Sequence, residues 1–399
     1  MNPLLISGFG TSINVDKAKL IINNKLKKEK LEFFPHKIDH DSIIIDGHTG
    51  YITFESLRWL SKHDIQLTLL NWNGNLLSVT LPDSPNSGKL RIKQYQKYQD
   101  DIIRYTIAEK IVFSKIDSSI NLLKELSKFY DIKINEIQNS IEKESSNYLS
   151  QEKSLSHLLT FEGRIAQVYF DALRVIFAKL APEFNFQGRK VKEYNRNYNA
   201  ADEINALLNY GYAILVSEIK KIINNYGLDS EIGFLHEITQ SRTPLVYDMQ
   251  ELFRWIVDLS VIQVLESGKL KKSDFILTEN YNIRLKENTA KLLISKIKDN
   301  FRIKMPYKGK NFHYENILAD NVSKLALFIS EKNKNISFDI PNISLNRNDS
   351  LVIQNKILKM TPEDRKKLGI NKSTLFYMKK NLQEGKNIKI YDKVIKKLN

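Results

Sequence analysis

The chain contains no cysteine, which removes several kinds of chemistry at once. Disulfides, zinc sites built from thiolates and cysteine nucleophiles are all excluded. The G-x-S-x-G, P-loop and H-E-x-x-H patterns of serine hydrolases, NTPases and zinc proteases are also absent. No apolar run approaches the roughly 18 residues that would span a membrane, and residues 1–17 lack the charged lead and apolar core of a signal peptide. We therefore expect a cytoplasmic protein with no membrane partner.

What the chain does have is length and positive charge. Its 399 residues, 42% of them hydrophobic, are enough for two or three domains with substantial cores. Lys and Arg number 61 against 46 Asp and Glu, which gives a formal net charge of +15. Such a surplus favours a polyanionic partner, meaning nucleic acid or an acidic membrane surface. The alternative is a general enrichment in lysine that says nothing about the partner.

The N-terminal quarter has the pattern of a small β-domain, which we assign to residues 1–88. Short β-rich runs are separated by turn residues, and Asn73-Gly74 between two such runs is typical of a hairpin. One helix is expected after Thr53, which has the residue type and position of an N-cap. Two prolines, a glycine and polar residues at 81–89 predict a linker.

After the linker the hydrophobic period becomes helical. Residues 89–335 repeat apolar side chains at helical spacing, and we predict a large all-α domain, with residues 248–268 among its long helices. The fold class predicted for the whole chain is α+β multidomain.

The C-terminal segment 345–399 predicts a basic helix–turn–helix. It carries 14 Lys and Arg against 5 Asp and Glu, so more than half of the net charge lies there. Thr361 is expected to cap the first helix, with Pro362 at its first position and Asp364 three residues on. The second helix is expected to enter a DNA major groove. The alternative is a basic hairpin that only packs on the body. The residues expected to contact DNA are Lys372, Thr374, Tyr377 and Lys379.

Four side chains of the helical region suit a hard divalent cation. Glu162 lies in an apolar phrase, where a buried charge needs a partner and a metal ion serves better than Arg164, which points to another face. Asp248 and Glu251 are three residues apart and share a helix face. Together with His236, which follows a glycine, they offer one imidazole and three carboxylates, a set that fits Mg²⁺ or Mn²⁺.

Each of these side chains also has a structural interpretation. A lone histidine is more often a structural residue than a ligand, and acidic residues are favoured near a helix start by the helix dipole. Either Asp248 or Glu251 can act behind the metal ligands instead of touching the cation.

Three further residues are candidates for DNA contacts. Asn209 lies beside Gly211 in an apolar helix, where glycine indicates tight packing or a close ligand, and the amide can orient a phosphate. Arg242 and Arg254 add positive charge near the predicted site. Arg254 is one turn past Glu251 and can equally be its salt-bridge partner.

Four phrases in this order resemble one family. FEGRIAQVY, ALLNYGYAIL, GFLHE and LVYDMQELFRWIVD are similar to motifs of the CRISPR-associated integrases that insert new spacers, the Cas-one family. The resemblance extends from the N-terminus to about residue 335. It implies metal-dependent DNA nicking and strand transfer, in which a DNA 3′-hydroxyl attacks a target phosphodiester. It also implies that Glu162, His236 and Glu251 are the metal ligands and that Asp248 lies beside them.

The resemblance implies partners as well: double-stranded DNA, a second copy of the chain joined through the β-domain, and the small protein Cas-two. The basic C-terminal extension departs from the spacer integrases and is typical of a related branch, the casposases, which integrate a casposon by the same chemistry without Cas-two. We take the spacer integrase as the primary prediction because that family is the larger. The remaining alternatives are a non-catalytic nucleic-acid-binding protein and a metal-dependent RNA nuclease.

Overall fold

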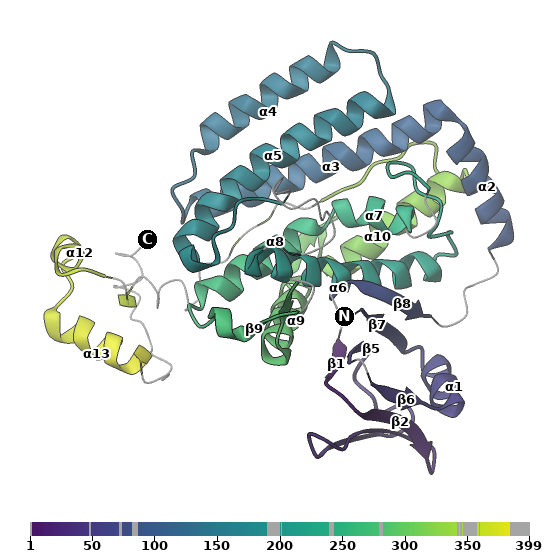
Figure 1. The fold of residues 1–399 in the computed structure, drawn as a ribbon. Helices are drawn as coiled ribbons and strands as arrows, with labels where there is room; N and C mark the ends of the chain where they lie inside the picture. Colours follow the sequence, from purple (N-terminus) through teal and green to yellow (C-terminus); the bar gives the residue numbers. More distant parts are fainter. Residues whose placement is uncertain are drawn as a thin grey trace.

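The computed structural model describes residues 2–47, 49–71, 74–81, 87–189, 200, 202–238, 243–278, 282–340, 343, 345, 357–358 and 360–383. Within them, no helix combines the length and hydropathy needed to span a membrane. A β-rich N-terminal part lies against a larger helical body, and a short pair of helices lies to one side (Figure 1).

Two four-stranded sheets form the N-terminal part. The first has the order β1-β5-β7-β8, with β1, β5 and β7 parallel and β8 antiparallel to β7. Its strands are Pro3–Ser7, Ser42–Asp46, Gln66–Leu70 and Leu76–Thr80. The second has the order β4-β3-β2-β6. Its strands are Glu29–Phe33, Lys19–Asn24, Thr11–Asp16 and Gly50–Ile52.

The first sheet is buried on both faces, which explains the unbroken apolar run of β5. Successive strand residues point to opposite faces, so Ile44 joins the core of the helical body while Ile43 joins the core shared with the second sheet. Helix α1 (Phe54–Lys62) adds Trp59 to that second core. As predicted, Thr53 caps α1 by accepting a hydrogen bond from the Ser56 N–H at 3.2 Å.

The predicted hairpin is confirmed by the antiparallel pairing of β7 with β8. Gly74 has the φ of +80° that such a turn requires, while Asn73 lies outside the described residues. Most of the predicted linker, residues 82–86, also lies outside them.

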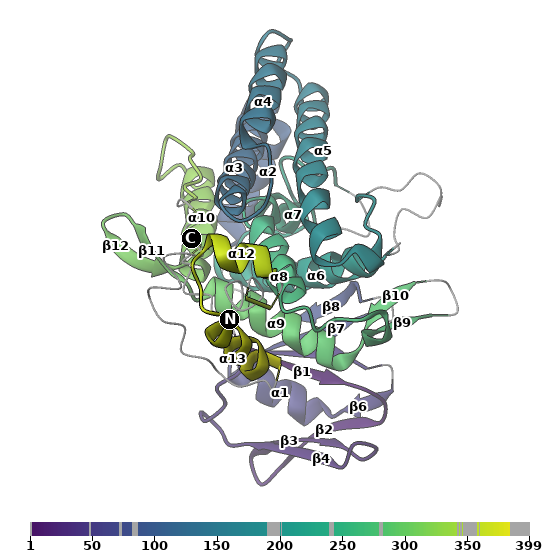
Figure 2. The ribbon, with the colours of Figure 1, turned by 90° about the vertical axis from the view of Figure 1, so that its left-hand side faces the viewer.

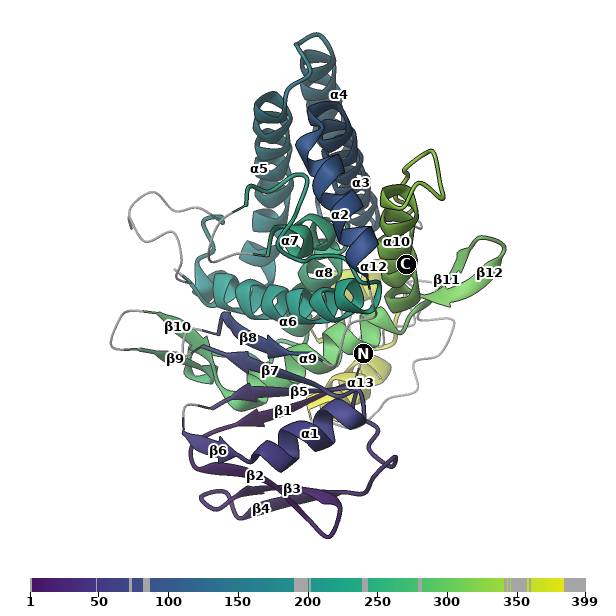
Figure 3. The same ribbon diagram turned by 90° about the vertical axis from the view of Figure 1, so that its right-hand side faces the viewer.

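The helical body packs on the first sheet through α6 (Figure 3). Its helices are α2 (Gly88–Gln99), α3 (Asp101–Ser127), α4 (Ile134–Leu149), α5 (Leu155–Leu180), α6 (Glu203–Asn225), α7 (Pro244–Glu251), α8 (Arg254–Glu266), α9 (Glu287–Phe301) and α10 (Tyr314–Ile329). Two 3₁₀ turns, Pro182–Phe184 and Lys272–Asp274, lie between them. Helices α3, α4 and α5 run alongside one another and extend away from the sheets (Figure 2).

The prediction of an all-α region at 89–335 is wrong in two places. The body contains two antiparallel ribbons, β9 (Phe275–Leu277) with β10 (Ile283–Leu285), and β11 (Lys304–Tyr307) with β12 (Lys310–His313). These strands have three or four residues, too few for an alternating pattern to stand out against helical spacing.

The single helix predicted at 248–268 is also wrong, because the chain breaks between α7 and α8. Phe253 leaves the helical conformation with φ −125° and ψ 6°, and it is completely buried. The apolar period continues through the break, so the sequence pattern conceals it.

The C-terminal helices are α12 (Pro362–Lys367) and α13 (Lys372–Gln383). The expected cap of α12 is present: Thr361 Oγ1 accepts the Asp364 N–H at 3.1 Å, and the Asp364 carboxylate accepts the Thr361 N–H at 3.0 Å. Gly369, with a φ of 58°, lies in the turn between the helices.

Candidate functional site

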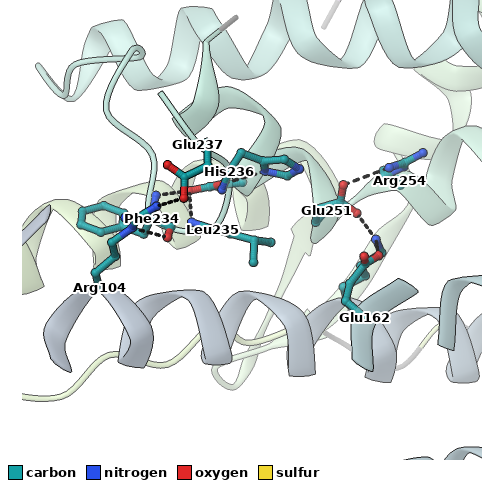
Figure 4. Close-up of polar contacts among 10 residues, drawn as sticks. Arg104, Glu162, Phe234, Leu235, His236, Glu237, Glu251 and Arg254 are labelled. Atoms are coloured by element: carbon teal, nitrogen blue, oxygen red, sulfur yellow. Dashed lines mark hydrogen bonds and ion pairs between the residues drawn. The ribbon is translucent and has the colours of Figure 1, made fainter. Parts of the chain in front are cut away.

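Four elements bring polar side chains together inside the helical body (Figure 4). Lys115 comes from α3, Glu162 from α5 and Glu251 from the end of α7. His236 lies in the segment between α6 and α7, and its ring points toward Glu251 (Figure 4). The predicted residues Glu162, His236 and Glu251 therefore converge although 89 positions separate the first from the last.

Asp248 lies behind His236 and holds it in place. Its carboxylate has no exposed surface. It accepts the backbone N–H of Phe234, Leu235 (3.1 Å) and His236 (3.0 Å), and it contacts the ring Nδ1 of His236 at 2.8 Å. Of the two acids, Asp248 therefore lies behind His236, while Glu251 faces Lys115.

Gly233 allows this close approach. A Cβ atom there would lie 2.6 Å from Pro244 Cβ and 2.9 Å from Asp248 Oδ2, closer than side chains tolerate. The segment can thus wrap over the start of α7 only because residue 233 has no side chain.

Glu251 is the more buried of the two acids that contact Lys115, with 5% of its side chain exposed. Its Oε1 accepts a hydrogen bond from Arg254 at 2.9 Å. Its Oε2 forms an ion pair with Lys115 Nζ at 2.5 Å. Burial opposes the charge of this carboxylate, but the positive charges of Arg254 and Lys115 lower the pKa of Glu251 to about 2.

Lys115 links the two acids, because its ammonium also forms an ion pair with Glu162 Oε1. Arg164 forms an ion pair with Glu144 instead, as expected for a residue on another face of α5. Lys115 was not predicted from the sequence. Its signal is the one that drew attention to Glu162, a charge inside an apolar helical run: Ile111 and Val112 are fully buried and Ile116 nearly so.

The pKa of His236 is raised above its ordinary value. Burial favours the neutral ring, but the hydrogen bond to Asp248 and the negative charges of Asp248 and Glu251 outweigh it. Since Nδ1 is engaged by Asp248, Nε2 is the ring nitrogen left for a ligand.

As these side chains stand, no three His, Asp or Glu residues in the described part of the chain form a ready metal site. The donor set nevertheless fits a hard divalent cation, because two carboxylates meet at one positive charge beside an imidazole. The residues that would hold such a cation are Glu162, His236 and Glu251.

Arg254 and Asn209 belong to a buried polar network next to the site. The Arg254 guanidinium lies 4.4 Å from the centre of the Tyr212 ring, and the Tyr212 hydroxyl donates to Asp258. Arg189, another residue missed from the sequence, packs near Tyr212 as well and donates to Asn209 Oδ1 at 2.8 Å. Asn209 thus has Arg189 as a protein partner at its amide oxygen.

Four of the other predicted DNA contacts lie apart from this site, on α13 (Figure 1). Lys372 and Tyr377 are exposed, and Thr374 is half-buried. Lys379 donates to the backbone oxygen of Met360 at 2.9 Å. Arg242 lies outside the described residues.

Comparison with known proteins identifies relatives along most of the chain. Residues 4–299 match the family model of CRISPR associated protein Cas1. The CRISPR-associated endonuclease Cas1 1 of Archaeoglobus fulgidus is 26% identical over 342 residues, 82% of this chain and 96% of that protein. The CRISPR-associated protein Cas1 3 of Methanobrevibacter ruminantium is 31% identical over 305 residues, 74% of this chain and 86% of that protein.

Solved structures show a similar relationship. A casposase bound to integration product matches with a TM-score of 0.78 at 36% identity, covering 90% of this chain and 99% of that chain. A CAS1 protein from Thermotoga maritima shares the fold, with a TM-score of 0.69 at 18% identity over 85% of this chain and 99% of that one. By the match over residues 4–299, the chain belongs to the Cas1 family.

Proposed function

We propose that this protein is a metal-dependent DNA integrase and endonuclease, which joins a DNA 3′-hydroxyl to a phosphodiester of a target DNA. The observation that carries the proposal is the convergence of Glu162 and Glu251 on one positive charge beside His236, in a chain of the Cas1 family. Glu162, His236 and Glu251 hold Mg²⁺ or Mn²⁺ in this proposal. When bound, the cation stabilises charge that develops on the attacked phosphate and helps to activate the hydroxyl.

The protein's own residues have distinct parts in this proposal. Asp248 fixes the tautomer and direction of the His236 ring, as a carboxylate behind a metal-binding histidine does. Arg254 stays positive beside Glu251 and keeps a quarter of its side chain exposed, so it can meet a DNA phosphate. Asn209 acts through Arg189 and positions this region.

The casposase branch has support from two observations. The identity to a casposase bound to integration product is 36% over 90% of this chain. In addition, α12 and α13 lie beyond residue 299, where the Cas1 family match ends. The competing label, a CRISPR spacer integrase, has support from the named Cas1 relatives and from the likeness in fold to a Cas6-RT-Cas1–Cas2 complex. It would need Cas2 as a partner.

In this proposal, three parts of the chain have separate roles. Residues 1–88 would join two copies of the chain, and residues 89–335 would carry the catalytic site. Residues 345–399 would bind double-stranded DNA as a helix–turn–helix. The exposed side chains of Lys372 and Tyr377, together with Phe376, which is 61% exposed, give α13 a basic and aromatic surface suited to that task.

The test is a strand-transfer assay with the purified chain alone. A short labelled duplex with free 3′-hydroxyls is mixed with a supercoiled plasmid and Mn²⁺. Label in the plasmid, lost on adding EDTA, is the expected result, and product without Cas2 identifies the casposase branch. Product only with Cas2 identifies the spacer integrase. DNA binding without product in either case would leave a non-catalytic binding protein, and cleavage confined to RNA would indicate a nuclease of another kind.

A further inference from the structure

Lys115 lies at the centre of the candidate site. Its ammonium contacts Glu162 and lies 2.5 Å from Glu251 Oε2, so it lies where the two proposed ligand carboxylates meet. Only 16% of its side chain is exposed. A divalent cation that bound both carboxylates would need the same place, because the two acids converge on no other described positive charge.

The two acids need a positive charge between them to remain close. Glu251 is almost fully buried, and a buried carboxylate beside another carboxylate is strongly destabilised unless a cation compensates. Arg254 bonds to Glu251 Oε1 and does not reach Glu162 in any ion pair of the described residues. Lys115 is thus the charge that holds the acids together.

The two cations around Glu251 are held in different ways. Arg254 is fixed on two sides, since its planar guanidinium packs on Tyr212 while it bonds to Glu251. The interactions found for the Lys115 ammonium are those with Glu162 and Glu251. Lysine carries its charge on a flexible four-carbon stem, so this charge can withdraw while the stem stays packed.

We propose that Lys115 competes with the divalent cation for Glu162 and Glu251. Its ammonium keeps the two carboxylates together until Mg²⁺ or Mn²⁺ displaces it, and it thereby sets the metal affinity of the site. This inference deepens the proposed function and rests on it. It explains why the acids and His236 converge without forming a ready metal cluster. The opposite case is a permanent salt bridge that remains in place when the metal binds.

The first test measures Mn²⁺ binding by calorimetry for Lys115→Met, which keeps the stem and removes the charge. A unit charge a few ångströms from the metal position opposes binding strongly even at a high effective dielectric, so we expect affinity to rise about tenfold or more. Lys110→Met is the control, because Lys110 lies exposed on the same helix. Unchanged or weaker binding by Lys115→Met would overturn the proposal.

The second test uses the unaltered chain and so does not depend on the variant folding. Lysines are acetylated briefly with and without Mn²⁺, and the modified sites are quantified by mass spectrometry. Displacement exposes the Lys115 amine, so its labelling is expected to increase severalfold with Mn²⁺ while that of Lys110 stays constant. No increase at Lys115 under saturating Mn²⁺ would mean that the ammonium stays in place, which contradicts displacement.

The proposed function and the role of Lys115 can fail separately in these experiments. If the unaltered chain binds no Mn²⁺, both are wrong. If Mn²⁺ supports strand transfer but neither the affinity of Lys115→Met nor the labelling of Lys115 changes, only the role of Lys115 is wrong.

Discussion

Asp248 holds His236 by its backbone and its ring at once, with the same carboxylate oxygen 3.0 Å from the amide nitrogen and 2.8 Å from Nδ1. Its other oxygen accepts the N–H groups of Phe234 and Leu235. A fully buried carboxylate thus closes the segment before α7 and aims the imidazole. The fold and the proposed metal site both depend on this side chain, so a comparison of Asp248 and His236 variants should separate the two.

Asp248→Asn is expected to damage both stability and metal binding. The amide would turn an N–H₂ group toward backbone donors, so we expect a loss of about 3 kcal/mol in the free energy of unfolding. Mn²⁺ affinity should fall roughly 10- to 100-fold because the ring loses its orientation. His236→Ala should lose comparable or more affinity but only about 1 kcal/mol of stability. Urea unfolding and Mn²⁺ titration measure the two quantities, and equal stability losses would contradict this division.

Two helical glycines should respond in opposite directions to alanine. At Gly211 a Cβ atom would lie 2.5 Å from Val257 Cγ1, because α6 and α8 pack closely there. Gly211→Ala should therefore cost about 1–3 kcal/mol, and a second change, Val257→Ala, should lessen that cost. At Gly163 nothing lies within 4 Å of the added atom, so Gly163→Ala should stabilise α5 by up to about 1 kcal/mol. Thermal unfolding of the two variants measures both effects. Destabilisation by both substitutions would contradict the predicted difference.

Local signals in the sequence predicted local structure well. Thr53 and Thr361 cap the helices expected of them, and Gly74 lies in the predicted hairpin. The misses were of two kinds. The break at Phe253, a completely buried residue, lies inside a continuous apolar period and has no local sign in the sequence. The β11–β12 ribbon was missed although its two-residue turn, Lys308 and Gly309 with positive φ, is a local feature.

At the candidate site, too, some residues could be predicted from the sequence and others could not. Glu162, His236 and Glu251 were found from residue type, spacing and family resemblance, and the structure brings them together. Lys115 was not found, since no spacing relates it to Glu162 or Glu251 and its importance comes from the packing of α3 against α5 and α7. The place of Asp248 behind the ring likewise needs coordinates, because spacing allows either acid to face the cation.

The buried Glu218 should make the protein less stable as pH rises. Burial on α6, reinforced by the charge of Asp41 and opposed by Lys221, raises the pKa of Glu218 to about 7. Its pKa is therefore higher in the folded than in the unfolded chain, so its stability contribution is present below about pH 4.5 and is lost as pH rises through 7. Glu218→Gln should thus gain about 3 kcal/mol over the unaltered chain at pH 8 and little at pH 4.5. Urea unfolding at both pH values tests this.

The control for Glu218 is Glu142→Gln, which changes an exposed carboxylate on α4. It should shift the unfolding free energy equally at both pH values. A gain in unfolding free energy for Glu218→Gln that does not grow with pH would show that Glu218 is not the source of the pH dependence.

The C-terminal helices should contribute to DNA affinity through charge. Deleting residues 345–399 also removes the Leu345 N–H that donates to Glu125, so charge variants are the cleaner test. Lys372→Ala with Lys380→Ala, both exposed on α13, should weaken DNA binding. The slope of log K against log salt should fall by about 1 for each DNA phosphate that the variant no longer neutralises.

The matched control for these lysines is Lys332→Ala with Lys334→Ala, which removes two exposed charges just after α10. Its salt slope should stay close to that of the unaltered chain. The same slope in both double variants would rule out a specific part for α13.

The central claim is that Glu162, His236 and Glu251 carry strand transfer and not DNA binding. The most direct measurement compares the unaltered chain with Glu162→Gln and His236→Ala, recording joined plasmid product and the Kd for DNA under the same Mn²⁺ and salt conditions. The account predicts that both variants bind DNA as the unaltered chain does and yield no joined product. Joined product at the unaltered rate from either variant would contradict it.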